Sequence, residues 1–440
     1  MFSTPTSIKR HRLSIDSPVR WLVSTGVATS IDTTTRKLRI RFIFGVIVVA
    51  LLVGVSLIVA QVQPGAPATA TSTTLTPRPA LSLETIAFSS PSTGWGVFTK
   101  ESPNGETCKD FVGHSSDGGA VFGLLVHAMS WNCSSNEFSS SLSLDGHGDG
   151  FLYGPWLYVS HDDAKVWTRS PQPGSVLDVD AIGLSVWMVE SICTHIDTVS
   201  LLRCPVRLIE SADGGRTWEP SPTVPPRLVT GLRNGANGQT YLVRTSRSAA
   251  YLMLAPASMR YDASSVIPLW FTSNGGISWS NRQVPCGALS AVLSAAPNGT
   301  LMAVCASGPG AGMQLKSVLE STNGGRNWEV KYRCLPSDMS SCPESDIDSG
   351  YLGTIDLVTS REAFLVGDRS SLLVTHDGGI RWQAVQPFIG SSAGGTAKVI
   401  FFDISHGLVL GENDSNNEDS TLWSTVDGGK HWTAELPRTS

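Results

Sequence analysis

The eight cysteines carry the most distinctive chemistry in this sequence. Their number is even, all of them lie beyond residue 100, and none has the spacing of a CxxC or Cys/His metal site. This distribution is typical of a set of disulfides, which persist in an oxidising compartment. The alternative is a set of buried free thiols in a cytosolic protein. The cysteines are Cys108, Cys133, Cys193, Cys204, Cys286, Cys305, Cys334 and Cys342.

Two acid-rich stretches are the next candidates for a chemical role. One contains Asp338, Glu344, Asp346 and Asp348, and the other spans 412–419. Clustered carboxylates can hold Ca²⁺, so the first stretch is the candidate calcium site. The alternative is that both stretches are solvated, charged loops.

The remaining polar residues form no recognisable catalytic motif. The nine histidines are scattered, and none is paired with a convincing serine or cysteine nucleophile. The sequence also lacks a glycine motif of the phosphate-binding kind. We therefore predict no catalytic residue and no cofactor. A glycosidase that needs only two carboxylates about 5–10 Å apart stays open as an alternative.

The charge is distributed unevenly along the chain. Residues 1–41 contain eight Lys/Arg against two acids, whereas the chain from Leu81 onward has 23 basic and 35 acidic residues. A region this acidic repels a phosphate backbone, so we expect no nucleic-acid partner.

One apolar segment, residues 42–62, contains no charged residue. At about 1.5 Å per residue, a helix of this length spans a bilayer core. Basic residues precede it closely, and Arg78 is the only basic residue between positions 63 and 99. This asymmetry predicts a single-pass membrane protein with a cytoplasmic N-terminus and the rest of the chain outside. The alternative is a cleaved signal peptide, which the long preceding segment disfavours.

The segments on either side of this predicted helix have compositions that do not favour a packed core. Residues 1–41 are basic and rich in Ser and Thr, and we predict a disordered cytoplasmic tail. Residues 63–80 are rich in Pro, Thr and Ala and predict an extended linker. The domain organisation is thus tail 1–41, transmembrane helix 42–62, linker 63–80 and a folded domain 81–440.

The folded domain repeats one short pattern seven times, at spacings of about 50 residues. An acid or amide follows a Ser or Thr, and a Gly-Gly pair comes next in all but the second copy. The Asx residue can close a turn onto backbone N–H groups two or three residues later, and the glycines supply positive φ. The Asx residues are Asp117, Asp162, Asp213, Asn274, Asn323, Asp377 and Asp427. Each is followed five residues later by an aromatic residue: Phe122, Trp167, Trp218, Trp279, Trp328, Trp382 and Trp432.

These repeats resemble the Asp-box, or bacterial neuraminidase repeat, S/T-x-D-x-G-x-x-W/F. The stretch around Ile86 and Trp95 resembles the photosystem II assembly-factor-like subgroup of that superfamily. The resemblance covers residues 81–440 and implies an all-β, seven-bladed β-propeller with four-stranded blades. It places each box in the turn between the third (C) and fourth (D) strands.

The resulting assignment of strands A to D separates two faces of the propeller. Boxes and A–B turns share one face, and the long segments fall mostly between B and C or between D and A on the other. These segments are 133–139, 192–203, 246–265, 306–313, 333–350, 386–396 and 412–419. The cysteines map to this second face, where neighbours in sequence pair sensibly: Cys108–Cys133, Cys193–Cys204, Cys286–Cys305 and Cys334–Cys342. The first and last blades are expected to close without sharing a strand, although linker residues could add one.

Sialidase activity is disfavoured by the arginine pattern. The resemblance implies a clamp of three arginines, the first of them near the start of the propeller. No arginine occurs between Arg78 and Arg169, and Arg227 lies in the wrong blade for this role.

The sequence therefore predicts a membrane-anchored, extracytoplasmic and non-catalytic propeller. Its partner is expected to be a protein that contacts the face of the B–C and D–A loops. The alternative is a surface glycan-binding protein or a glycosidase of a non-sialidase type. For that alternative, Trp131, Trp156 and Trp270 are the aromatic candidates for stacking on sugars.

Overall fold

A computed structural model describes the chain from residue 81 to 439 apart from several internal segments, which are 134–139, 193–201, 222, 224–228, 233–239, 255–265, 288–289, 308–309, 311, 335–338, 386–388, 392–397 and 413–419. The predicted tail, membrane helix and linker lie outside the described residues. Within the part of the chain that is described, no helix combines the length and the apolar character of a membrane span.

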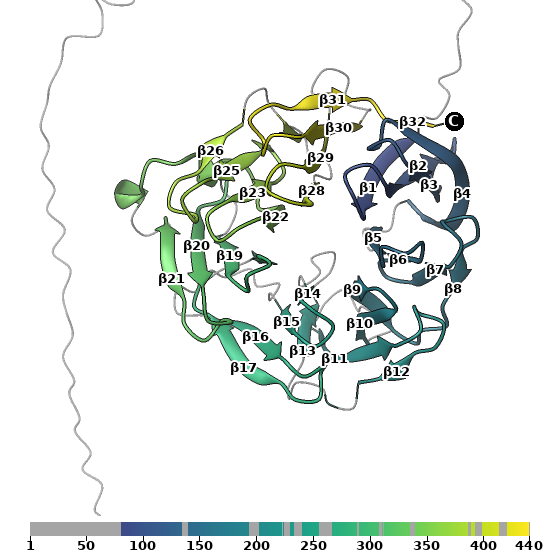
Figure 1. Ribbon diagram of the computed structural model, residues 1–440, viewed down its shortest axis with the longest axis horizontal. Helices are drawn as coiled ribbons and strands as arrows, with labels where there is room; N and C mark the ends of the chain where they lie inside the picture. Colours follow the sequence, from purple (N-terminus) through teal and green to yellow (C-terminus); the bar gives the residue numbers. More distant parts are fainter. Residues whose placement is uncertain are drawn as a thin grey trace, which may run out of the picture. The chain divides into compact units, whose positions relative to one another are not determined.

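Seven antiparallel sheets of four strands are arranged in a ring around a central axis (Figure 1). The first three blades, from innermost to outermost strand, contain β1 (Ser82–Phe88), β2 (Gly94–Glu101), β3 (Thr107–Ser115) and β4 (Val121–Asn132); β5 (Ser141–Leu144), β6 (Gly150–Tyr153), β7 (Leu157–Ser160) and β8 (Thr168–Arg169); and β9 (Ser175–Ile182), β10 (Ser185–Ser191), β11 (Leu202–Ser211) and β12 (Glu219–Pro220). The fold is a seven-bladed β-propeller.

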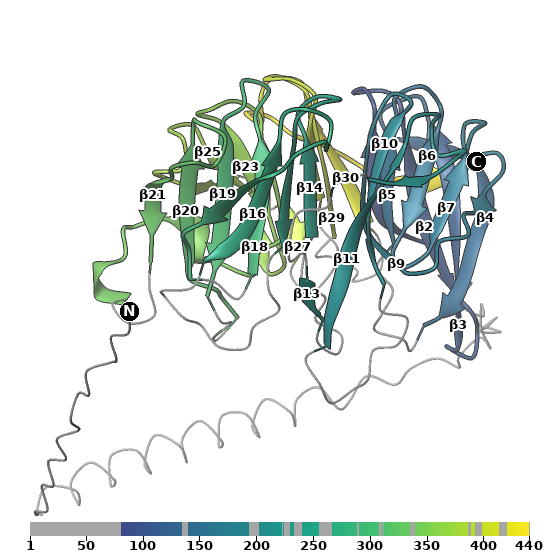
Figure 2. The same ribbon diagram turned by 90° about the horizontal axis from the view of Figure 1, so that it is seen from below.

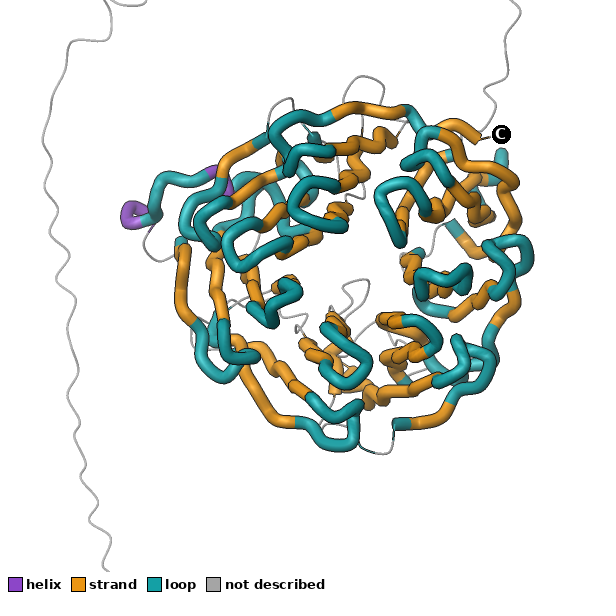
Figure 3. The backbone as a smooth tube through the Cα atoms, in the orientation of Figure 1, coloured by secondary structure: helices purple, strands orange, loops and turns teal. Residues whose placement is uncertain are grey.

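Blades four to seven repeat this arrangement. They contain β14 (Thr240–Arg244), β15 (Ala250–Leu254), β16 (Ile267–Thr272) and β17 (Ser280–Val284); β18 (Ser290–Ala295), β19 (Leu301–Ala306), β20 (Lys316–Ser321) and β21 (Glu329–Arg333); β22 (Thr354–Leu357), β23 (Ala363–Val366), β25 (Leu373–Thr375) and β26 (Gln383–Ala384); and β28 (Lys398–Phe401), β29 (Gly407–Glu412), β30 (Ser420–Thr425) and β31 (Thr433–Glu435). The alternation of strands and tight turns around the ring is visible in Figure 3.

Three further pairings extend this plan. The short strand β13 (Val229–Leu232) pairs with the N-terminal end of β11. β24 (Ser370–Ser371) pairs with β27 (Gly390–Ser391). The last strand, β32 (Arg438–Thr439), pairs in parallel with β4 and gives blade one a fifth strand. The sequence suggests the linker 63–80 as the source of an added strand, but the C-terminal residues form it in the structure. Two 3₁₀ turns, η1 (Met339–Ser341) and η2 (Asp346–Asp348), follow blade five.

The hydrophobic core lies between neighbouring blades. Trp95 of blade one and Leu152 of blade two are fully packed in one cluster. The ring closes in the same way, because Phe122 of blade one packs with Leu408 and Leu422 of blade seven. Closure of the propeller therefore combines apolar contact between the faces of its first and last blades with the pairing of β32 and β4.

Two predicted boundaries differ from the structure. The segment 246–265 was expected to be a B–C loop, but β15 lies inside it and 245–249 is an A–B turn. The shift arises because Val229–Leu232 pairs outside its own blade, so the innermost strand begins at Thr240. The repeat pattern predicts that the outermost strands of blades three, five and seven start at residues 216, 326 and 430. They start three residues later, at Glu219, Glu329 and Thr433, since the preceding turn takes up the first residues.

Candidate functional site

Each repeat turn, from the Ser or Thr to the aromatic residue, is held by the same hydrogen bonds. In blade one the Ser115 hydroxyl donates to Asp117 Oδ1 over 2.9 Å and accepts the N–H of Gly119. Asp117 Oδ1 accepts the N–H of Val121, four residues later. All seven Asx residues accept this bond, at Val121, Val166, Thr217, Ser278, Asn327, Arg381 and His431. The expected bond from the N–H three residues on is present at Asp213 and Asp377, which accept the N–H groups of Arg216 and Ile380, whereas the bond four residues on is common to all seven turns.

The repeat aromatics pack on the preceding blade. The ring centroids of Trp167 and Trp95 are 5.7 Å apart, and those of Trp218 and Phe151 are 6.4 Å apart. Trp382 lies in the core between blades five and six. The repeat side chains thus hold the scaffold together.

The second repeat lacks the glycine pair but keeps its conformation. Asp163 and Ala164 have φ of 58° and 65°, in the region that the glycine pairs of the other turns occupy. Left-handed conformations are costly for residues with a Cβ atom. In this turn Ser160 Oγ still accepts the N–H of Ala164, and the turn closes as in the other blades.

Three of the four predicted cysteine pairs are disulfides, namely Cys108–Cys133, Cys286–Cys305 and Cys334–Cys342. The fourth pair contains Cys193, which lies outside the described residues. Cys204 falls on β11.

The candidate calcium ligands that the structure describes make separate contacts. Asp338 lies outside the described residues, and Glu344 is exposed. Asp346 Oδ2 accepts the N–H of Ala384, whereas Asp348 accepts the Lys316 N–H and the Tyr332 hydroxyl. Asp346 and Asp348 therefore fasten different strands to the loop and do not face a common ion.

Four charged side chains on the innermost strands were not singled out from the sequence. Asp178 Oδ2 accepts the N–H of Leu242 at 2.7 Å, and Asp180 accepts that of Arg244 at 3.1 Å. Asp356 Oδ2 accepts the N–H of Phe401 at 2.6 Å. Burial raises the pKa of Asp178 and Asp356 to about 6 and that of Asp180 to about 7.

The fourth of these groups, Lys398, belongs to blade seven. Burial lowers its pKa to about 8, and the carboxylate of Asp178 in blade three opposes that shift. These carboxylates cap backbone N–H groups at the inner edge of a neighbouring blade, which is a structural task. These charged side chains come together only in the assembled ring, so no local sequence pattern predicts their role.

The aromatic residues proposed for sugar stacking are engaged elsewhere. Trp270 is buried in the core between blades three and four. The Arg169 guanidinium lies 4.8 Å from the centroid of the Trp156 ring. The Trp131 indole N–H donates to Asp110 at 3.1 Å.

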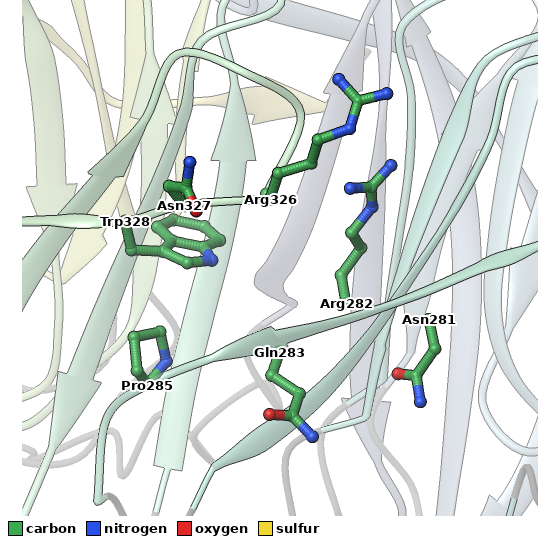
Figure 4. A pocket seen from close by; sticks show the side chains of 8 residues that line it. Asn281, Arg282, Gln283, Pro285, Arg326, Asn327 and Trp328 are labelled. Atoms are coloured by element: carbon green, nitrogen blue, oxygen red, sulfur yellow. The ribbon is translucent and has the colours of Figure 1, made fainter.

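A groove of about 580 Å³ lies between blades four and five (Figure 4). One wall comes from β17 and the residue after it, and the other from the repeat turn of blade five. The lining residues are Asn281, Arg282, Gln283, Pro285, Gly325, Arg326, Asn327 and Trp328. Two guanidinium groups, three side-chain amides and one indole give this groove a polar and cationic character. Its volume is in the usual range for ligand sites.

The two groove arginines have no carboxylate partner among the described residues. Both guanidinium groups extend to the same side in Figure 4. Burial and the neighbouring Arg326 lower the pKa of Arg282, and the Arg282 guanidinium lies 5.6 Å from the centroid of the Phe271 ring. The Nε atom of Arg282 is buried without a hydrogen-bond partner. An anionic group placed here would relieve the repulsion between the two cations.

The corresponding arginine of blade three shows what Arg326 lacks. Arg216 also follows its Asx residue by three positions, and its Nη1 lies 3.3 Å from Asp149 Oδ2. Arg326 follows Asn323, an amide, and ion-pairs with no described carboxylate. The groove therefore keeps two arginines available for a ligand.

A sequence signal for this groove existed but is weak by itself. Only the fourth and fifth repeats carry Asn in place of Asp, and no Asp or Glu occurs from residue 263 to 319. This gap in acidic residues contrasts with the acidity of the domain as a whole. The groove itself appears only when the outer strand of one blade meets the turn of the next.

Neither a protein-family model nor a curated protein matches the sequence. Among solved structures, the chain is similar to YCF48 from Cyanidioschyzon merolae, with 16% identity, a TM-score of 0.44 and coverage of 79% of this chain and 95% of that one. A structure of YCF48 bound to D1 peptide gives 14% identity, a TM-score of 0.42 and coverage of 69% and 82%. The GH74 xyloglucanase from Xanthomonas campestris gives 11% identity, a TM-score of 0.49 and coverage of 82% and 55%.

These structural neighbours are of the two kinds that the repeat pattern suggested, namely an assembly-factor propeller and a glycoside hydrolase. At such identities and TM-scores they add nothing to an argument about function.

Proposed function

We propose that this chain is a membrane-anchored, extracytoplasmic binding propeller without catalytic activity, and that it holds an anionic part of a protein partner in the groove between blades four and five. The observation that carries the proposal is the pair of guanidinium groups of Arg282 and Arg326, which face one groove and ion-pair with no described carboxylate. The anchor rests on the predicted helix at 42–62 and the basic residues before it.

The composition of the groove favours binding over catalysis. Among the residues that the structure describes, its lining contains no Asp, Glu, His, Ser, Cys or Tyr. General acid–base and nucleophilic mechanisms draw on such side chains. Arginine and tryptophan, in contrast, are enriched at energetically important positions of protein interfaces.

Site-specific cross-linking on cells that express the full chain tests this proposal. A photoreactive residue at Asn281 lies in the groove, and one at Ala434, two residues after the repeat tryptophan of blade seven, is the matched control. We expect position 281 to capture one envelope protein reproducibly and position 434 not to capture it.

A charge-reversal pair sharpens the result. Arg282→Glu combined with Arg326→Glu should abolish the adduct. Lys430→Glu, three residues after Asp427 and thus matched to Arg326, should leave it intact. Absence of any protein adduct from position 281, in a chain shown to be folded and at the membrane, would refute the proposal.

A glycan ligand is the second candidate, favoured by the Trp328 indole and by the amides of Asn281, Gln283 and Asn327 in the groove. Aromatic faces and amide groups are suited to sugar rings and hydroxyls. Retention on an array of charged and neutral glycans, lost in the Arg282→Glu/Arg326→Glu variant, would support this candidate and replace the protein partner.

A further inference from the structure

The groove follows the free edge of a β-strand. β17 is the outermost strand of blade four, and its described pairing is with β16 alone. Its other edge therefore carries backbone N–H and C=O groups that are not used within the sheet. Such an edge is able to accept another extended strand.

The residues lining the groove show that it includes this edge. Asn281, Arg282 and Gln283 are consecutive on β17, and all three line the groove. Side chains of successive strand residues point to opposite faces of a sheet. In Figure 4 the Arg282 side chain extends to one side of the strand, and those of Asn281 and Gln283 extend to the other. A cavity that touches all three must run along the strand edge.

The chain itself shows that an outermost strand of this propeller accepts an added strand. In blade one, Arg438 and Thr439 of β32 pair in parallel with Val121 and Phe122 of β4. The Arg438 N–H also donates to the carbonyl oxygen of Ala120. Blade four has no such fifth strand among the described residues, and its edge lies beside the two arginines.

We propose that the protein partner supplies an extended acidic segment that adds to the outer edge of β17 as a fifth strand. This inference rests on the proposed function and specifies how the partner binds. Backbone hydrogen bonds to β17 would give affinity, and carboxylates at alternate positions of the segment would reach Arg282 and Arg326. Residues on its other face would contact the amides of Asn281 and Gln283.

The length of the segment is limited by the strand and by a proline. β17 has five residues, and Pro285, which has no N–H to donate, follows Val284. At about 3.3 Å per residue, the paired part of the segment is roughly 17 Å long. Partly exposed charges are screened by salt, so binding should weaken as ionic strength rises.

The test uses the full chain in lipid nanodiscs and an acetylated, amidated heptapeptide of alternating glutamate and threonine. Two further peptides of the same sequence carry N-methyl groups on alternate backbone amides, in one phase or the other. We expect one phase of methylation to weaken binding roughly tenfold, or about 1.4 kcal/mol, and the other phase to have little effect. The cause is that only one set of amides faces β17.

Hydrogen exchange of the fragment that contains 280–284 provides a second readout. Strand addition should slow exchange of its edge amides when the unmodified heptapeptide binds, and the Arg282→Glu/Arg326→Glu variant should lose both binding and protection. No binding at about 1 mM, the weak end of specific affinity, would overturn the inference. So would binding that tolerates both phases of methylation and leaves exchange unchanged.

These outcomes are separable from those of the proposed function. Cross-links from position 281 to a protein, together with failure of the heptapeptide series, would leave the groove as a protein-binding site and eliminate strand addition. Failure of the cross-links as well would eliminate both.

Discussion

The carboxylate of Asp178 on β9 accepts a 2.7 Å hydrogen bond from the backbone N–H of Leu242 on β14. The two residues belong to blades three and four, so the bond joins the innermost strands of neighbouring blades, which lie side by side in Figure 1; Figure 2 gives the view of the ring turned by 90°. Asp180 and Asp356 form equivalent bonds. The inner wall of the propeller is thus tied together by acids whose pKa is raised by burial.

These acids predict that thermal stability falls as pH rises from 5 to 7.5. Their pKa in the folded chain is about 6 to 7, above the ordinary value of 3.8. A group with a raised pKa stabilises the fold at low pH, and this contribution is lost as pH rises through the folded pKa. Lys398, with a pKa lowered to about 8, titrates mainly above this window. Melting temperatures measured by circular dichroism across the range check the slope.

A substitution isolates one of these acids. Asp180→Asn keeps an oxygen for the Arg244 N–H but removes the titration, so it should raise the melting temperature by roughly 2 °C at pH 7.5 and by less at pH 5. Glu219→Gln, on the exposed outermost strand of blade three, is the control and should change neither value. An unaltered slope in Asp180→Asn would show that other groups cause the pH dependence.

The repeat turns should tolerate an amide but not the loss of the acceptor. Asp377 Oδ1 accepts the N–H groups of Ile380 and Arg381 and the hydroxyl of Thr375. Asp377→Ala removes three hydrogen bonds, two of them to exposed N–H groups that water can then reach, and should cost about 1–3 kcal/mol of unfolding free energy. Asp377→Asn is the matched control, since Asn274 and Asn323 accept the hydroxyl and the N–H four residues on in blades four and five. Urea denaturation separates the two variants; an equal loss in both would mean that the charge, not the acceptor, is required.

Two adjacent glycines should respond differently to alanine. Both Gly118 and Gly119 have positive φ, so each substitution strains the turn. A Cβ atom at Gly119 would lie 2.1 Å from Leu422 Cδ2 in blade seven, whereas one at Gly118 would lie 3.3 Å from the Pro91 carbonyl oxygen. Gly119→Ala should therefore cost about 1–3 kcal/mol more, through overpacking of the joint between first and last blades. Equal melting temperatures of the two variants would contradict this account of closure.

The disulfides should contribute according to the length of the loop that each closes. Cys108–Cys133 spans 25 residues and Cys334–Cys342 spans 8. Chain-entropy arguments then predict that replacing both members of the first pair by alanine costs about 1 kcal/mol more than replacing the second pair. Guanidinium titration of the two double variants under oxidising conditions measures this difference. The reverse order would show that native-state contacts outweigh loop closure.

Much of the fold could be predicted from the sequence because its determinants are local. A turn that needs an Asx acceptor, a Ser or Thr hydroxyl and two residues of positive φ is recognisable as a motif of eight consecutive residues. Seven such motifs at a regular spacing give the number of blades and the order of the strands. Cysteines close in sequence and bound to the same blade, such as Cys108 and Cys133, could likewise be paired.

The sequence was less informative wherever long-range pairing decided the outcome. Val229–Leu232 forms β13 against β11, and this shifted the strands of blade four from their expected places. Arg438 and Thr439 join blade one because the ends of a closed ring meet. Neither pairing has a local signature.

The candidate site belongs to this second category. The sequence by itself determined that the domain is acidic and that blades four and five carry Asn instead of Asp in their turns. Only the tertiary structure decided that Arg282 and Arg326, 44 positions apart, share one groove beside a free strand edge. The reason is geometric: a groove is formed by two blades at once, whereas the repeat pattern specifies each blade separately.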